Sequence, residues 1–117
     1  MINSSIIYQI TEKLKKAAID KIILFGSYAN GTPTENSDID LLVVTSDNYM
    51  PKSYTEKSKL VLKINALIEL EKEEVPIDLI IHTLPMHKKF IELNSMFSRE
   101  ILQKGKILYE RNNSALA

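Results

Sequence analysis

The fold of this chain is decided by one stretch of its sequence, Gly26-Ser-Tyr-Ala-Asn-Gly-Thr-Pro-Thr-Glu-Asn-Ser-Asp38-Ile-Asp40. Before it comes Lys21–Phe25, a short run of β-branched and apolar residues that predicts a buried strand. Glycine, asparagine and proline recur from residue 26 to residue 36, which indicates a loop between regular elements. A second strand is predicted at Ser37–Thr45, where acidic and apolar residues alternate before the run becomes wholly apolar.

Two carboxylates stand near the start of this second predicted strand. Asp38 and Asp40 are two residues apart, and side chains with that spacing project from the same face of a strand. Carboxylate oxygens are hard ligands for Mg²⁺, which completes its octahedron with water and substrate phosphates. A pair of such ions clamps the attacking and leaving oxygens of an in-line phosphoryl displacement. Asp38 and Asp40 are therefore predicted to be catalytic and metal-binding residues.

Gly26 and Ser27 have the character of a phosphate site. They directly follow a strand and can open a short helical turn, where backbone N–H groups are unpaired and point outward. Glycine lets the chain approach a ligand closely, and the Ser27 hydroxyl supplies a further donor. Taken alone, the pair would be better explained as an ordinary turn, and the nearby carboxylates as solvated strand residues. Their combination favours a functional site.

A third carboxylate, Asp78, lies inside the otherwise apolar predicted strand Val75–His82. A carboxylate in such a strand must be paired, hydrated or metal-bound, although it could also protect a sheet edge against aggregation. If this strand neighbours the strand of Asp40, Asp78 can complete the metal site. It can then serve as a metal ligand or as the general base for an acceptor hydroxyl.

The remaining pattern predicts an α/β (α+β) protein in which helices cover a small sheet. Helical spacing predicts a first helix over residues 4–18 and a second from the capping-box residue Ser53 to a point before Pro76. A last helix is expected to end at Gly105, followed by a short extended piece at Lys106–Tyr109. The predicted order of elements is α-β-β-α-β-α.

Composition excludes several classes of protein. A length of 117 residues fits one domain, which we assign to residues 1–111, with a disordered tail at 112–117. Fifteen basic residues balance fifteen acidic ones, which argues against binding of long nucleic acid through many phosphate contacts. The absence of cysteine excludes disulfides, and no apolar run approaches the length of a membrane span. No secretory signal is recognisable, so we expect a cytoplasmic protein.

The pattern of Gly26-Ser27, ten intervening residues, Asp38-Ile39-Asp40 and a later aspartate in an apolar strand resembles the nucleotidyltransferase superfamily related to DNA polymerase beta. The small size, the run from Ser37 to Val43 and the ending Gly105-Lys-Ile-Leu-Tyr109 look like its minimal nucleotidyltransferase (MNT) branch. The resemblance covers most of the chain. It implies a nucleotidyltransferase fold, with a mixed β-sheet flanked by helices.

The resemblance also implies a Mg²⁺-dependent enzyme that moves a nucleoside monophosphate, AMP from ATP or the equivalent from another NTP, to a hydroxyl acceptor. It adds Ser37 to Gly26 and Ser27 as an expected nucleotide-binding residue. Members of this branch often pair with a helical HEPN protein in toxin–antitoxin pairs, in some cases adding AMP to a tyrosine of that toxin. We expect a HEPN-type partner to supply the acceptor, within a homo- or hetero-oligomer.

Two other functions remain open. Many relatives carry arginine in the segment after Gly-Ser, whereas this chain reads Tyr28-Ala29-Asn30, and its two arginines are Arg99 and Arg111. A non-catalytic module that masks a HEPN toxin by contact is therefore one alternative. A stand-alone transferase acting on a small molecule such as an aminoglycoside is the other. Tyr28 could stack on a base or an acceptor, but we expect it to be a partly exposed loop residue.

Overall fold

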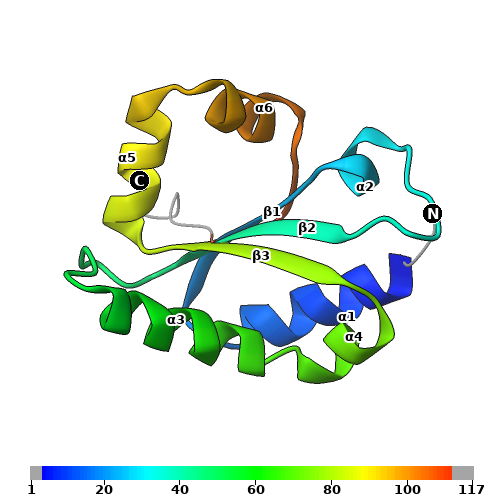
Figure 1. The fold of residues 1–117 in the computed structure, drawn as a ribbon, viewed down its shortest axis with the longest axis horizontal. Coiled ribbons are helices and arrows are strands. Elements are labelled where there is room, and N and C mark those ends of the chain that lie inside the picture. Colours follow the sequence, from blue (N-terminus) through cyan, green and yellow to red (C-terminus); the bar gives the residue numbers. More distant parts are fainter. Residues whose placement is uncertain (1–3, 112–117) are drawn as a thin grey trace.

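The structure, a computed structural model, describes residues 4–111, and the predicted tail at 112–117 lies outside them. The described residues form a four-stranded sheet with helices on both faces (Figure 1). In chain order the elements are α1 (Ser4–Lys15), β1 (Ile19–Phe25), α2 (Ser27–Asn30), β2 (Ile39–Thr45), α3 (Tyr54–Ala66), α4 (Glu69–Glu74), β3 (Ile77–His82), α5 (Leu84–Leu93), α6 (Met96–Lys104) and β4 (Lys106–Glu110). The predicted order is present, with a short helix after β1, two divided helices and a fourth strand. Across residues 4–111, no helix is both long and apolar enough to span a bilayer.

The sheet is mixed, as the resemblance implies. Its strand order is β3-β2-β1-β4, with β2 and β3 parallel and the other two pairings antiparallel. The antiparallel β1 and β2 are joined by the loop that begins at Gly26, whereas the parallel pair requires a crossover, which α3 and α4 provide. β4 pairs with β1, so that Ile107 lies opposite Ile23. The loop that carries the predicted site therefore connects the two central strands.

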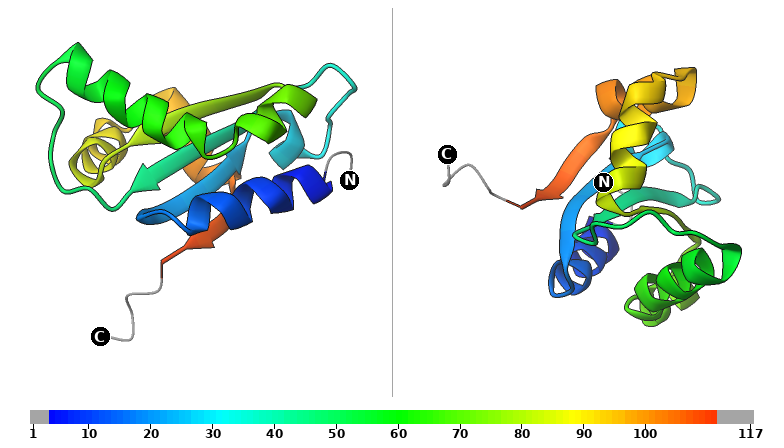
Figure 2. Two further views of the ribbon diagram at one scale, coloured as in Figure 1. Left: turned by 90° about the horizontal axis from the view of Figure 1, so that it is seen from below. Right: turned by 90° about the vertical axis from the view of Figure 1, so that its left-hand side faces the viewer.

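Different helices cover the two faces of the sheet, α1, α3 and α4 on one and α5 and α6 on the other (Figure 1 and Figure 2). Successive strand residues point to opposite faces, so Leu41 lies in the larger core beneath α1 and Leu42 in the smaller core beneath α6. Asp40 and Asp78 each stand two residues before a member of the smaller core, Leu42 or Ile80. Both carboxylates therefore belong to the α5–α6 side of the sheet.

The prediction of unbroken helices before Pro76 and before Gly105 is wrong at one point in each. Ile68 departs from helical geometry (φ −125°, ψ 30°) and its side chain is fully buried, so packing divides α3 from α4 without a glycine or proline. Asn94 ends α5 in the left-handed conformation (φ 49°, ψ 42°). Ser95 then caps α6 by accepting a hydrogen bond from a backbone N–H of that helix.

α6 ends at Gly105 as predicted, but for a different physical reason than the one that usually selects glycine there. The backbone of Gly105 is extended (φ −70°, ψ 159°) and is open to any residue. A Cβ at this position would meet the Ile101 carbonyl oxygen and lie 2.6 Å from the Ile23 side chain. Glycine is required because α6 and β1 approach each other closely.

Candidate active site

The parallel pairing of β2 and β3 brings two of the predicted carboxylates side by side. Asp40 is the register partner of Asp78, and neighbouring strands lie about 4.8 Å apart. The predicted role of Asp78 depends on its strand lying next to that of Asp40, and the sheet fulfils this condition. Asp38 lies just before β2 and is exposed to solvent. The structure thus brings all three predicted carboxylates to one end of the sheet.

The three carboxylates interact electrostatically. Partial burial raises the pKa of the Asp40 carboxyl above its ordinary value, and the charges of Asp78 and Asp38 raise it further. Within residues 4–111, no lysine, arginine or histidine forms an ion pair with any of the three. Like charges gathered in this way repel each other, and a bound cation would relieve the repulsion.

Gly26 lies against one of these carboxylates. Its backbone has a φ of +76° and a ψ of −156°, a region that residues with a Cβ rarely adopt. A Cβ built at Gly26 would collide with Oδ2 of Asp40, which stands opposite the preceding Phe25 in the β1–β2 ladder. Glycine is therefore needed both for the backbone turn and for the close approach of the Asp40 side chain.

The short helical turn predicted after Gly26 is present as α2. The N–H groups of Ala29 and Asn30 both bond to the Gly26 carbonyl oxygen. The first residues of a helix leave their own N–H groups without an intrahelical partner, so the backbone at Ser27 is suited to receive an anion. Ser27 directly follows Gly26, the glycine that lies against Asp40. The predicted phosphate site and the predicted metal site are therefore next to each other.

The expectation that Tyr28 is partly exposed is wrong. Its side chain is 1% exposed and belongs, with Ala29, to the larger hydrophobic core. Only Asn30, at the end of α2, is exposed to solvent. The apolar pair between polar Ser27 and Asn30 is the sequence signal for this, because a one-turn helix can be held in place only by burying part of its surface. Tyr28 thus anchors the loop and is buried away from any bound base.

Ser37 has a local structural task in the loop. Its hydroxyl accepts a hydrogen bond from the Thr34 N–H at 2.8 Å and lies 3.3 Å from the Thr34 hydroxyl. These contacts close a turn just before Asp38 and hold the chain as it enters β2. The expected contact of Ser37 with a nucleotide stays a prediction.

The donor set fits a hard divalent ion. Among residues 4–111, no three histidine, aspartate or glutamate side chains lie close enough together to hold a metal ion as a complete protein site. Mg²⁺ does not require one, because it is usually held by one or two carboxylates and completes its shell with water and substrate phosphates. Asp40 and Asp78 on adjacent strands, with Asp38 close by, provide carboxylates of that kind on the side of the sheet that faces the Gly26–Ser27 turn.

An apolar wall borders the carboxylates. The ring of Phe25, opposite Asp40, meets the ring of Phe97 on α6 edge to face, with centroids 5.9 Å apart. Phe97 remains half exposed, and Met96, its neighbour in the chain, is more exposed still. Helical spacing alone would assign Phe97 to the core, and only the position of α6 over the sheet shows that it lies beside the acidic end.

A Gly-Ser turn, an Asp-x-Asp pair and a third aspartate on the neighbouring parallel strand form the arrangement of the nucleotidyltransferase class. The sequence matches the family described as Polymerase beta, Nucleotidyltransferase over residues 8–114, and the chain belongs to this family. It is accordingly a nucleotidyltransferase.

Known proteins similar to this chain agree with that class. A Methanocaldococcus jannaschii protein named "Putative protein adenylyltransferase MJ0604" is 39% identical over 98 residues, which span 80% of this chain and 82% of that one. A "putative nucleotidyltransferase" from Sulfolobus solfataricus has a TM-score of 0.58 at 16% identity, covering 92% of this chain and 79% of the other. A structure described as a toxin–antitoxin with AMP-PNP has a TM-score of 0.54 at 22% identity, covering 97% of this chain and 77% of that one. At these identities the two solved structures establish the fold alone.

Proposed function

We propose that this nucleotidyltransferase moves AMP from ATP, with Mg²⁺, to a tyrosine hydroxyl of a helical HEPN-type partner, and so acts as a cytoplasmic antitoxin. The observation that carries the proposal is the pairing of Asp40 with Asp78 on adjacent strands beside Gly26. The name of the M. jannaschii relative supports an adenylyl group and a protein acceptor. A similar fold in a toxin–antitoxin assembly with an ATP analogue supports the nucleotide and the setting.

In this proposal Asp38, Asp40 and Asp78 hold the metal. Mg²⁺ bound there would polarise phosphate oxygens and offset their negative charge as the reaction proceeds. Asp40 is the most strongly positioned of the three, because its carboxylate is half-buried and packed against Gly26. Asp38 and Asp78 are both exposed to solvent, and in this proposal Asp78, which lies outside the Asp-x-Asp pair, would take the proton of an arriving acceptor hydroxyl.

The loop residues would hold the triphosphate. Backbone N–H groups at Gly26 and Ser27, together with the Ser27 hydroxyl, would be the donors, and the hydrogen bond between Ser37 and Thr34 supports the loop that follows them. The tyrosine oxygen attacks the α-phosphorus and forms a new O–P bond. The bond from this phosphorus to the oxygen that bridges it to the β-phosphorus breaks, and pyrophosphate leaves. The hydroxyl proton passes to Asp78.

The acceptor would approach along the α5–α6 side. Phe97 is part of the wall that borders the carboxylates, and Met96, next to it in α6, is largely exposed. Exposed apolar surface next to a polar site is typical of a surface that a protein partner covers. A macromolecular acceptor therefore suits this site better than a small molecule such as an aminoglycoside, which would need an enclosing pocket.

The test is adenylyl transfer from ATP labelled at the α-phosphate to the helical protein encoded beside this chain. We expect labelled partner, released pyrophosphate, an added AMP on tyrosine by mass spectrometry, and loss of all three on chelation of Mg²⁺. Asp38→Ala and Asp40→Ala should each abolish labelling. Asp47→Ala, beyond the opposite end of β2, is the matched control and should retain it. Labelling by the Asp38→Ala/Asp40→Ala protein at the wild-type rate would refute the assignment.

One observation favours a second candidate, contact masking of the partner without catalysis. The segment that follows Gly26 in this chain offers no cationic side chain, and Asn30 is its one exposed residue among positions 28–30. Within this segment, a triphosphate would thus rely on the Ser27 hydroxyl, backbone donors and metal. Neutralisation of the partner by the Asp38→Ala/Asp40→Ala protein, with no modified tyrosine, would identify masking as the function.

A further inference from the structure

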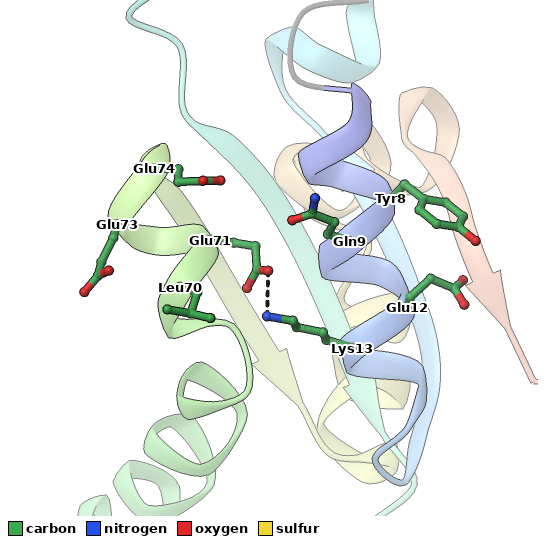
Figure 3. A pocket seen from close by; sticks show the side chains of 8 residues that line it. All are labelled: Tyr8, Gln9, Glu12, Lys13, Leu70, Glu71, Glu73 and Glu74. Atoms are coloured by element: carbon green, nitrogen blue, oxygen red, sulfur yellow. Dashed lines mark ion pairs between the residues drawn. The ribbon is translucent and has the colours of Figure 1, made fainter.

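The sheet face covered by α1, α3 and α4 carries two hollows that the proposed reaction does not use. The first, of about 520 Å³, lies between α1 and α4 (Figure 3). The second, of about 510 Å³, lies along α3 and is lined by Tyr54, Lys57, Ser58, Val61 and Leu62. α3 and α4 follow one another along this face, with α1 beside them (Figure 2), so the hollows mark its two ends.

The hollow between α1 and α4 is acidic and contains an unsatisfied buried oxygen. Glu12, Glu71, Glu73 and Glu74 line it, with Lys13 as their one basic neighbour in the lining. Glu71 Oε2 pairs with Lys13 Nζ at 2.7 Å, while its Oε1 has no hydrogen-bond partner within residues 4–111. Figure 3 shows this carboxylate directed into the space between the two helices, although the side chain is only 4% exposed. A buried carboxylate oxygen of this kind calls for a donor from outside the chain.

The end of the face formed by α3 has the opposite charge. α3 carries three lysines, Lys57, Lys59 and Lys63, against one glutamate, Glu56. α4 carries four glutamates against one lysine. One face of the molecule thus has a basic end and an acidic end, each with a hollow of nearly equal volume.

Large apolar side chains are exposed at both ends of the face. Leu62 on α3 is 69% exposed and Leu70 on α4 is 66% exposed, with Tyr54 and Tyr8 exposed near them. Exposed aromatic and leucine side chains within a charged rim are typical of a protein–protein interface. The face therefore has both parts of an interface, apolar anchors and charges of both signs.

We propose that this face binds a second copy of the same chain through a two-fold axis. A two-fold axis that lies in the interface, at right angles to the line joining the two ends, sets each end of one copy against the opposite end of the other. The acidic hollow of each copy then faces the lysine-bearing α3 of the other. Such an arrangement is self-complementary in charge, because Lys57, which lines the hollow along α3, faces the glutamates that line the hollow of the other copy. Asp40 and Asp78 belong to the other side of the sheet, so both catalytic ends stay open in the dimer.

The oligomeric state of the full chain, measured by size exclusion with light scattering and by sedimentation, tests the proposal. We expect wild-type protein to form a dimer, and Leu62→Asp or Leu70→Asp to shift it to monomer. Leu93→Asp on α5 replaces an equally exposed leucine on the opposite face and should leave the dimer intact. Circular dichroism confirms that each variant is folded. A wild-type monomer at all concentrations, or a dimer that both α3 and α4 variants leave unchanged, would overturn the proposal.

Charge exchange provides the sharper test. Glu73→Lys/Glu74→Lys makes both ends basic and Lys57→Glu/Lys59→Glu makes both acidic, so each variant alone should dimerise about tenfold or more weakly. Mixing the two variants places opposite charges at both contacts and should restore a one-to-one dimer. This recovery would not follow from misfolding or from an interface elsewhere. Mixed variants that remain monomeric while wild type dimerises would show that another surface holds the dimer.

Discussion

Gly26 is subject to two constraints that mutation can separate. Its backbone has a positive φ (+76°), which residues with a Cβ rarely adopt, and a Cβ would also collide with the Asp40 carboxylate. Gly31 has nearly the same φ (+77°) but open space around the position of a Cβ. We expect Gly31→Ala to cost only backbone strain, about 1–2 kcal/mol of unfolding free energy. Gly26→Ala should cost more and should also remove adenylyl transfer, because Asp40 must move.

Urea unfolding and transfer from labelled ATP measure the two effects in the same pair of proteins. Gly31 (ψ 18°) is in the left-handed region, whereas Gly26 (ψ −156°) lies in a region that only glycine adopts freely, so the stability difference combines this extra strain with the contact to Asp40. The loss of transfer activity reports on the contact itself. Equal losses of stability and activity in the two variants would show that the close approach of Gly26 to the carboxylate does not contribute to adenylyl transfer.

The residues of the site illustrate what a sequence can predict. Asp38, Asp40 and Gly26 are close in the chain, so their spacing alone indicated a shared location. Asp78 is distant, and its place opposite Asp40 depends on strand order and register, which the sequence does not contain. Tyr28 was misassigned because residues in a loop are expected to be exposed, whereas this loop includes a one-turn helix that must be anchored in the core.

At the scale of elements, the two helix breaks differ in whether the sequence contains a signal for them. Asn94-Ser95 is a recognisable pair, a residue that tolerates the left-handed conformation followed by a favourable N-cap. Leu67-Ile68 has no such signal, because both residues continue the apolar spacing of a helix. The break between α3 and α4 arises because the Ile68 side chain is buried in the core, and this tertiary packing overrides the local preference for a continuous helix.

The Asn94 hinge between α5 and α6 can be tested by a substitution series. Asn94→Gly should leave stability unchanged or slightly raised, since glycine adopts a φ of +49° freely. Asn94→Ala should lose stability and Asn94→Val more, with the valine variant about 1–2 kcal/mol below wild type. Thermal and urea unfolding give the order. A valine variant as stable as the glycine variant would contradict the assignment of a left-handed cap, and Ser95→Ala, expected to cost about 1 kcal/mol, provides the comparison at the adjoining cap.

At the scale of the whole molecule, the sheet separates two titratable clusters with opposite effects on stability. The carboxylates lie where β2 and β3 begin, and a histidine pair lies where β3 ends. Because the pKa of Asp40 is raised in the fold, the folded state binds its proton more readily than the unfolded chain, and acidification relieves repulsion there. The same relief is available from a bound cation at neutral pH, so Mg²⁺ should raise the unfolding temperature of the protein.

The histidine pair links β3 to α5. His82 and His87 approach with Nδ1 atoms 3.3 Å apart, and Phe90 contacts both rings. Burial lowers the pKa of His82 to about 4, aided by the charges of His87 and Lys57. Burial also lowers the pKa of His87, with Lys21 acting in the same direction and Asp20 against it. Both histidines are therefore neutral in the folded protein at neutral pH.

This pair predicts that the protein loses stability on mild acidification. Between pH about 6.5, where an unfolded histidine titrates, and pH about 4, His82 is protonated in the unfolded chain but remains neutral in the folded protein. The contribution of His82 to the unfolding free energy should fall in this interval by up to about 1.4 kcal/mol per pH unit, and His87, whose pKa is also lowered in the fold, acts in the same direction. Urea unfolding at a series of pH values measures the slope. His82→Gln/His87→Gln should flatten the slope between pH about 6.5 and about 4, whatever the stability of the variant itself. An unchanged slope in the histidine double variant would assign the acid sensitivity to other groups.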